Sequence, residues 1–193
     1  MNYRIVLASN SPRRNEMLSK FLNEFEVIAS EYEENIDNYG NPKIEVMKAA
    51  LLKGMNVVDK VDKPSIIIAA DTVVFYESIL EKPKSEEEAK MMLKTLSNKW
   101  HDVYTGFAII DSTTNKSIIN FEKTRVKFNN LSSELIDWYV ASKEPMDKAG
   151  AYGIQDLGAL LVEKIEGDYF NVVGFPISKI HEMLCSHFNY KFF

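Results

Sequence analysis

The chain has very little cysteine and histidine. Cys185 is the single cysteine among 193 residues, which excludes both a disulfide within the chain and a zinc site built from several thiolates. Of the three histidines, two lie near the C-terminus, and their spacing does not match a metal site. We therefore expect the third, His101, to be a structural hydrogen-bonding residue.

Long apolar runs and an excess of positive charge are also missing. No run approaches the roughly 18 apolar residues of a membrane span, and the N-terminus lacks the apolar core of a signal peptide. We expect a cytoplasmic protein without a membrane partner. The chain has 23 basic and 28 acidic residues, a net charge of −5, which argues against nucleic acid as a partner because a phosphate backbone needs a basic face. The net charge is still compatible with a small phosphorylated ligand that a few local cations hold.

The chain has an ordinary globular composition, with 46% hydrophobic and 26% charged residues. Its length suits one domain over residues 1–193, or one elongated two-lobed unit. Apolar patterns predict strands over residues 3–8, 25–29, 65–76, 100–111, 118–128, 160–165 and 169–173. Helices are predicted over residues 12–22, 44–58 and 89–96, after Ser132 or Ser133, and after Pro176.

The most apolar stretch, residues 65–76, contains a carboxylate. Its β-branched and aromatic residues do not alternate with polar ones, which predicts a strand buried on both faces at the centre of a sheet. Asp71 lies in its middle, and a buried charge is costly unless it is paired, hydrogen-bonded or bound to a metal. Two interpretations stay open: a satisfied core aspartate, or a carboxylate that acts on a metal or a water molecule in a cleft.

Two serines and two arginines lie in residues 9–14, where the first predicted strand turns into the first predicted helix. Ser11 suits the N-cap position, and Pro12 suits the first helical position. A helix N-terminus favours anions, so Arg13 and Arg14 run against the helix dipole there. The turn is therefore a candidate anion site, although solvated surface arginines would give the same pattern.

Other charged residues could serve the same ligand. Lys53 lies in the predicted helix 44–58, and Lys82 is held on extended backbone because Pro83 follows it. The acidic cluster of residues 31–37 includes Glu33, and one of its members could ligate a hard cation. Separate cations and carboxylates suit a polyphosphate bound with a divalent metal.

A glycine-containing loop over residues 144–155 ends in Gln155. Its small residues let the backbone approach a ligand closely, and the glutamine amide offers both a donor and an acceptor to a base edge. Neither a Walker A motif nor G-x-G-x-x-G is present. The residues alone thus indicate a metal-assisted enzyme of nucleotides or phosphates.

Several segments resemble, in order, the signature blocks of the Maf family. They are LASNSPRR at 7–14, AADTVV at 69–74, EKP at 81–83, HDVYTG at 101–106, DKAGAYGIQ at 147–155, and GDY, NVVG and FP within 167–176. The resemblance implies a nucleoside triphosphate pyrophosphatase, which cuts between the α and β phosphates. It also implies an α/β fold similar to that of the inosine triphosphate pyrophosphatases: a twisted mixed β-sheet flanked by helices, and two lobes with a cleft.

The resemblance also assigns roles to individual positions. Asp71 matches the proton acceptor of the family, and whether it activates water or holds a metal stays open. The positions linked to substrate choice are Arg13, Thr72 and Gln155. Phosphate binding is expected of Ser9, Arg14, Lys53 and Lys82, and binding of Mg²⁺ or Mn²⁺ is expected of Glu33 and Asp71.

The loop sequence KAGAYGIQ resembles the subgroup that acts on dTTP and UTP, rather than the subgroup that acts on 7-methyl-GTP. Two positions depart from the family, which usually has glycine where this chain has Asp156 and Asn98; asparagine tolerates a positive φ. The role implied is house-cleaning or linked to cell division, and a homodimer is implied as well. An alternative hypothesis is a nucleotide-binding regulator of septum formation with little turnover.

Overall fold

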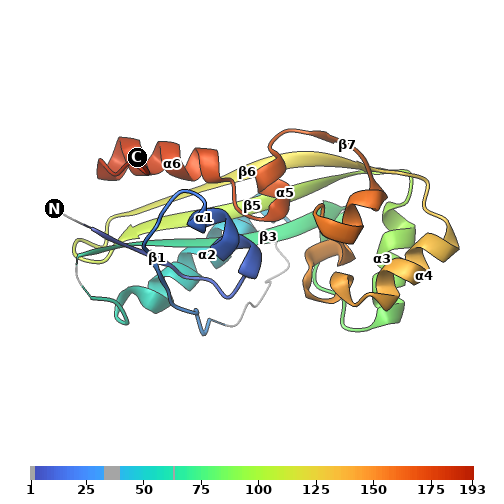
Figure 1. Ribbon diagram of the computed structural model, residues 1–193, viewed down its shortest axis with the longest axis horizontal. Helices are drawn as coiled ribbons and strands as arrows, with labels where there is room; N and C mark the ends of the chain where they lie inside the picture. The colour runs from blue at the N-terminus through green and yellow to red at the C-terminus, as the bar shows by residue number, and fades with distance from the viewer. Residues whose placement is uncertain (1–2, 33–39, 63) are drawn as a thin grey trace. The chain divides into compact units, whose positions relative to one another are not determined.

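The computed structural model describes residues 3–32, 40–62 and 64–193 (Figure 1). The strands are β1 (Arg4–Leu7), β2 (Glu26–Val27), β3 (Ser65–Tyr76), β4 (Ser78–Leu80), β5 (Trp100–Asp111), β6 (Ser117–Phe128) and β7 (Val162–Glu166). The α-helices are α1 (Pro12–Ser19), α2 (Pro42–Val58), α3 (Glu86–Leu96), α4 (Ser133–Ala141), α5 (Tyr169–Val173) and α6 (Ile177–Phe188). Three 3₁₀ helices, η1 (Glu144–Asp147), η2 (Ala149–Ala151) and η3 (Asp156–Leu161), follow α4.

The strands found in these ranges form one mixed sheet. Its order is β2-β1-β3-β5-β6-β7, with β4 paired to β3. β1 runs parallel to β2 and β3, whereas β4 is antiparallel to β3 and β7 is antiparallel to β6. The expected α/β class with a mixed sheet and flanking helices is therefore confirmed.

The strand β3, which is predicted to be central, lies inside the sheet between β1 and β5. Residues 66–70 of β3 are fully buried, as predicted for a strand covered on both faces. β1 pairs with β3 in the register Arg4↔Ser65 to Leu7↔Ile68, and Ala8 N donates to Ile68 O at 2.8 Å. This register brings the turn after β1 level with the end of the buried run of β3.

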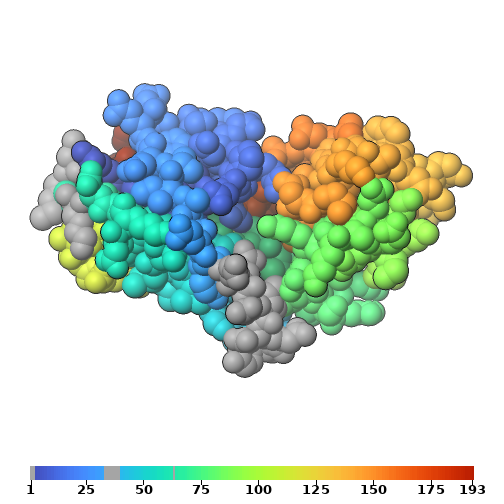
Figure 2. All heavy atoms as spheres, turned by 90° about the horizontal axis from the view of Figure 1, so that it is seen from below, coloured from blue at the N-terminus to red at the C-terminus, as the bar shows by residue number. Residues whose placement is uncertain are grey.

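Contacts divide the chain into two compact units. The first unit comprises Met1–Asp71, Thr105–Glu122 and Gly174–Phe193, and the second comprises Thr72–Tyr104 and Lys123–Val173. The apolar core of the first includes Val6, Ala50, Ile67, Ala108 and Ile110. The core of the second includes Leu93, Leu96, Val126, Phe128 and Tyr139. In the second unit α3 packs against α4, as the adjoining green and orange atoms of Figure 2 show.

The prediction of a strand over residues 169–173 is wrong, because these residues form the helix α5. The carboxylate of Asp168 accepts a hydrogen bond from Phe170 N at 2.9 Å, which turns the backbone into a helical conformation. Asn171 is fully buried and donates to Val103 O at 3.0 Å. These side-chain bonds override the strand preference of an aromatic and β-branched segment.

The first helix is shorter than the predicted range of residues 12–22. α1 ends at Ser19, so Met17 and Leu18 are buried in it, whereas Phe21 lies beyond the helix and is 45% exposed. The Phe21 ring packs 5.9 Å from the ring of Phe192 instead. Within the described ranges, no helix combines the length and apolarity that crossing a membrane requires.

Candidate active site

Asp71 is the last residue of the first unit, and it forms a buried ion pair. Its Oδ1 accepts a hydrogen bond from Lys53 Nζ at 2.7 Å, and the two side chains are only 10% and 15% exposed. The aspartate is therefore satisfied by a cation inside a largely apolar strand. A carboxylate held in place in this way is suited to accepting a proton or holding a hard cation.

Close packing of α2 on the sheet brings Lys53 to Asp71. A Cβ on Gly54 would lie 2.7 Å from Ile110 Cδ1, and a Cβ on Gly106 would lie 2.3 Å from the backbone oxygen of Val46. At Gly106 the backbone of α2 leaves no room for a side chain, and at Gly54 a side chain fits only if the end of Ile110 moves, so the helix backbone lies directly on β5. Glycine within a helix lowers its stability by roughly 1 kcal/mol relative to alanine. At this position the missing side chain lets the helix approach the sheet closely.

Arg14 lies beside this pair and makes several internal hydrogen bonds. Its Nε donates to Gly174 O at 2.8 Å, and its Nη1 donates to Ala70 O at 2.7 Å and to Ser9 Oγ at 3.4 Å. Ser9 Oγ also accepts from Ser11 N at 3.1 Å. The arginine thus ties the turn after β1 to the residue that precedes Asp71. These contacts place Ser9 and Arg14 in the same part of the first unit as the carboxylate.

The N-terminus of α1 has the features predicted for an anion site. Pro12 occupies the first helical turn, Ser11 is the N-cap residue but makes no side-chain capping bond, and no acidic residue lies in the first turn. Arg13 is half-buried there. A helix start with basic side chains and without an acidic cap favours a bound anion. The first unit therefore gathers a buried carboxylate, Lys53, Arg14, Ser9 and this helix start.

The remaining predicted residues lie elsewhere. Thr72 follows Asp71 in β3 and is half-buried, Lys82 is exposed after β4, and Gln155 is half-buried in the loop before η3; all three belong to the second unit. Glu33 lies outside the described residues. The roles predicted for these four residues stay predictions.

The donor set at Asp71 fits a divalent cation of the kind that the resemblance implies. In the described ranges no group of three or more histidine, cysteine or acidic side chains could form a complete protein-made metal site. A buried carboxylate at a cationic cluster nevertheless suits Mg²⁺, which is usually held by one or two carboxylates together with substrate phosphates and water. Asp71 is the described residue that would hold such an ion.

The backbone has a positive φ at both positions where the family usually has glycine, and the tolerance expected of Asn98 is confirmed. Asn98, at a position where the family usually has glycine, has φ +57°, and Asp156, at the other such position, has φ +49°. Both residues adopt the left-handed conformation that glycine adopts most easily. His101 is also a structural residue as predicted, because its Nε2 lies 2.8 Å from the hydroxyl of Tyr152.

Some residues that build this region were not identified from the sequence. The carbonyl oxygens of Ala70 and Gly174 carry no signal in a sequence, because every residue has one. Gly54 does carry a signal, since a glycine inside a helical pattern indicates close packing. Tyr139 and Glu144, which hold the loop around Gln155, were not singled out either.

Comparisons with known sequences match nearly the whole chain. A family model described as Maf-like protein matches residues 4–187. A relative from Alkaliphilus oremlandii (strain OhILAs), named dTTP/UTP pyrophosphatase, is 51% identical over 185 residues and covers 96% of each chain. A relative of the same name from Thermosipho melanesiensis is 50% identical over 182 residues, covering 93% of this chain and 96% of its own. Among solved structures, a HAM1 protein from Coxiella burnetii is 15% identical, with a TM-score of 0.48 over 94% of this chain and 100% of that one.

Proposed function

Because the chain belongs to the Maf-like protein family, we propose that it is a nucleoside triphosphate pyrophosphatase that hydrolyses dTTP and UTP to the monophosphate and pyrophosphate. The observation that carries this proposal is the pair of relatives named dTTP/UTP pyrophosphatase, each about half identical over more than nine-tenths of both chains. The buried Asp71–Lys53 pair beside Arg14 supports it, because hydrolysis of a phosphoanhydride needs a base and cations.

The reaction we propose begins when the oxygen of a water molecule attacks the α-phosphorus. The water gives a proton to the Asp71 carboxylate, the bond from the α-phosphorus to the bridging oxygen breaks, and pyrophosphate leaves with that oxygen. Lys53 holds the Asp71 carboxylate in place through the hydrogen bond that its Nζ donates. Arg13, Arg14 and the start of α1 offset the negative charge that develops on the phosphates.

We propose a divalent metal as cofactor, with Asp71 and the predicted Glu33 as its protein ligands. When bound, Mg²⁺ or Mn²⁺ would neutralise and polarise the substrate phosphates. For Thr72 and Gln155 we keep the proposed role in substrate choice, and for Lys82 the proposed role in phosphate binding. We place the protein in the cytoplasm, in keeping with a chain whose single cysteine offers no disulfide. The homodimer stays a prediction.

The proposal is tested by incubating the protein with Mg²⁺ and dTTP, UTP, dCTP, dATP, GTP or 7-methyl-GTP, and measuring pyrophosphate and orthophosphate separately. We expect pyrophosphate in amounts equal to the monophosphate, fastest from dTTP and UTP. Nucleotide binding without either product would favour the regulator hypothesis. Release of orthophosphate would mean that a different bond is cut.

A further inference from the structure

Two side chains of the second unit hold both ends of the loop that carries Gln155. The hydroxyl of Tyr139 accepts a hydrogen bond from Gly153 N at 3.2 Å and donates to Glu144 Oε1 at 3.0 Å. The Glu144 carboxylate also accepts from Leu157 N through Oε2 and from Gly158 N through Oε1, both at 3.2 Å. We call Tyr139 and Glu144 the loop clamp. It fixes backbone groups two residues before Gln155 and two and three residues after it.

The two ends of this loop also touch each other. A Cβ on Gly158 would lie 1.9 Å from the carbonyl oxygen of Gly153 and 2.9 Å from the hydroxyl oxygen of Tyr139. Residues 153–158 thus form a closed turn that only a glycine at position 158 allows. Asp156 completes the turn with its positive φ of 49°. Gln155 lies within this closed turn, with its backbone direction set from both sides.

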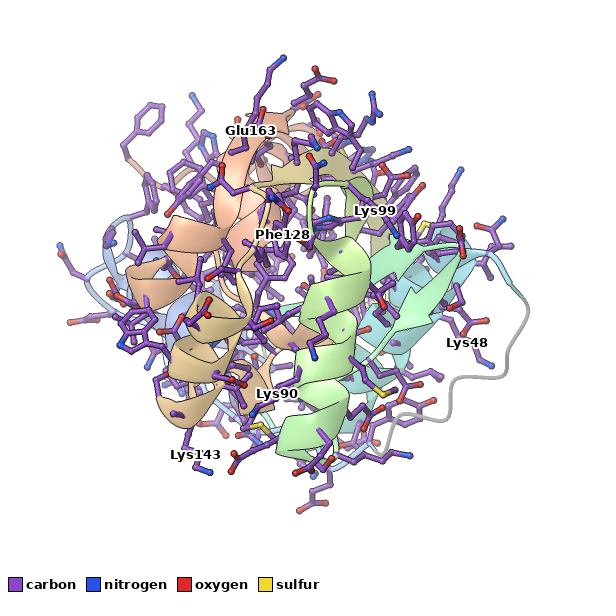
Figure 3. All side chains as sticks on the ribbon, turned by 90° about the vertical axis from the view of Figure 1, so that its right-hand side faces the viewer. Lys48, Lys90, Lys99, Phe128, Lys143 and Glu163 are labelled. Carbon is purple, nitrogen blue, oxygen red and sulfur yellow. The ribbon has the colours of Figure 1, made fainter. Side chains whose placement is uncertain are left out.

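The helix that carries Tyr139 packs against α3. Tyr139 is fully buried in α4, and burial raises the pKa of its hydroxyl, which keeps the proton that it donates to Glu144. Lys90 of α3 contacts Asp137 of α4 at 2.6 Å, and Lys143 after α4 pairs with Glu86. Figure 3 shows Lys90 and Lys143 on this side of the protein, where α3 and α4 lie in front. The helix that supplies Tyr139 is therefore fixed to its neighbour.

From these contacts we infer that Tyr139 and Glu144 are positioning residues that set base preference by holding Gln155. The inference rests on the proposed function, in which the Gln155 amide contacts a base. Glutamine has a long side chain with several rotamers, so its amide can discriminate between bases only when its backbone is fixed. One carboxylate that accepts from two backbone N–H groups and a hydroxyl is suited to fixing it.

The test compares Glu144→Gln with Tyr139→Phe and with the matched control Glu163→Gln, whose side chain is exposed on β7 (Figure 3). Glu144→Gln keeps the shape but turns one of the two acceptor oxygens into an NH₂ group, which faces a backbone donor. We expect the ratio of kcat/KM for dTTP to that for dATP to fall about tenfold, a factor that corresponds to 1.4 kcal/mol. The control keeps the wild-type ratio.

If Glu144 only stabilises the fold, its substitution should not change the ratio of kcat/KM for dTTP to that for dATP. If Glu144→Gln lowers kcat/KM equally for both nucleotides, or leaves the ratio unchanged, the inference is overturned. Should this variant fail to fold, Tyr139→Phe decides by the same ratio, because it removes only the hydroxyl from the clamp.

Two further measurements separate the inference from the proposed function. If wild type releases no pyrophosphate from any nucleotide, the proposed function fails. The clamp is then judged by the ratio of the dissociation constants for dTTP and dATP, and by hydrogen exchange at Gly153, Leu157 and Gly158. An unchanged ratio with unchanged exchange in Glu144→Gln overturns the inference, whereas a lower ratio with faster exchange at Leu157 and Gly158 supports it.

Discussion

Asp71 and Lys53 place opposite charges side by side where little water reaches them. A buried pair of this kind gains little net stability, because the attraction is offset by the loss of hydration, but removal of either partner leaves a costly charge. The sequence suggested two interpretations of Asp71, a satisfied core residue or a reactive one. The structure is compatible with both interpretations. Lys53 satisfies the Asp71 carboxylate, and Arg14 and Ser9 lie in the same part of the first unit.

His101 gives stability a dependence on pH. Burial lowers the pKa of its imidazole from 6.5 to about 4, and among the described residues its Nδ1 has no hydrogen-bond partner. Between those two pH values the unfolded chain binds a proton that the folded protein does not. The free energy of unfolding should therefore fall by about 1.4 kcal/mol per pH unit as the pH drops through this window.

The measurement is urea unfolding at pH 7 and at pH 5. His101→Gln should lose less stability over this interval than wild type, because a glutamine takes up no proton. Equal losses in wild type and His101→Gln would contradict the assignment of this pH dependence to His101.

Asp156 holds a left-handed backbone conformation that glycine adopts at lower cost. Asp156→Gly should raise the free energy of unfolding by about 0.5–1 kcal/mol, since relief of the positive φ outweighs the extra freedom of glycine in the unfolded chain. Asp59→Gly is the matched control, because Asp59 has φ −85° at the end of α2 and should give no gain. A gain in the control but not in Asp156→Gly, measured by urea unfolding, would count against this account.

At the scale of helices and strands, the packing of α2 against β5 determines where Lys53 lies. Gly106 places its backbone against the backbone of α2 at Val46 and Met47, whereas Gly54 places its backbone against the flexible end of the Ile110 side chain. Backbone cannot move aside without moving the whole helix, but a methyl group can rotate away. The two glycines therefore differ in how much a side chain would disturb the ion pair.

Gly106→Ala should consequently lower the free energy of unfolding by about 3 kcal/mol or more, or prevent folding, in the range of severe overpacking. Gly54→Ala should cost much less, because Ile110 can adjust and alanine favours the helix. Thermal unfolding of the two variants compares them directly. A Gly54→Ala variant that is less stable than Gly106→Ala would contradict this packing argument.

Elements with a strong local pattern could be predicted from the sequence. β3 spans residues 65–76 as predicted, and Ser85 and Ser132 cap α3 and α4 by accepting from Glu88 N and Leu135 N. Local chemistry alone decides these features: continuous apolar residues in the first case, and a serine before a helix in the others.

Elements decided by distant partners could not be predicted in this way. Residues 169–173 have strand-forming side chains, yet the bonds of Asn171 to the distant Val103 and Thr124 hold them in a helix. The loop clamp likewise joins Tyr139 and Glu144 to Gly153, Leu157 and Gly158, whose approach depends on the folded chain. Of the candidate site, the sequence indicated Asp71 and the arginines, but only the fold shows that Lys53 pairs with Asp71.

For the molecule as a whole, a net charge of −5 opposes a polyanionic substrate. The first unit offsets this locally with Arg13 and Arg14, in addition to Lys53, which pairs with Asp71 in the middle of β3. Local cations decide the binding of a small charged ligand more than the total charge does, because salt screens distant charges over about 8–10 Å. The prediction that the ligand is a compact phosphorylated molecule is compatible with this distribution of charge.

The most direct test of the proposed chemistry is pyrophosphate release from dTTP by Asp71→Asn, with Asp111→Asn as the matched control. Asp111 is also a buried aspartate of the first unit, but it accepts its hydrogen bonds from Tyr3 and Thr113 at the far end of β5. We predict that Asp71→Asn folds, still binds dTTP, and retains less than about a tenth of wild-type turnover, in line with the loss of a general base. Asp111→Asn should keep most of the turnover. A folded Asp71→Asn variant that releases pyrophosphate at more than about a tenth of the wild-type rate would contradict the assignment of Asp71.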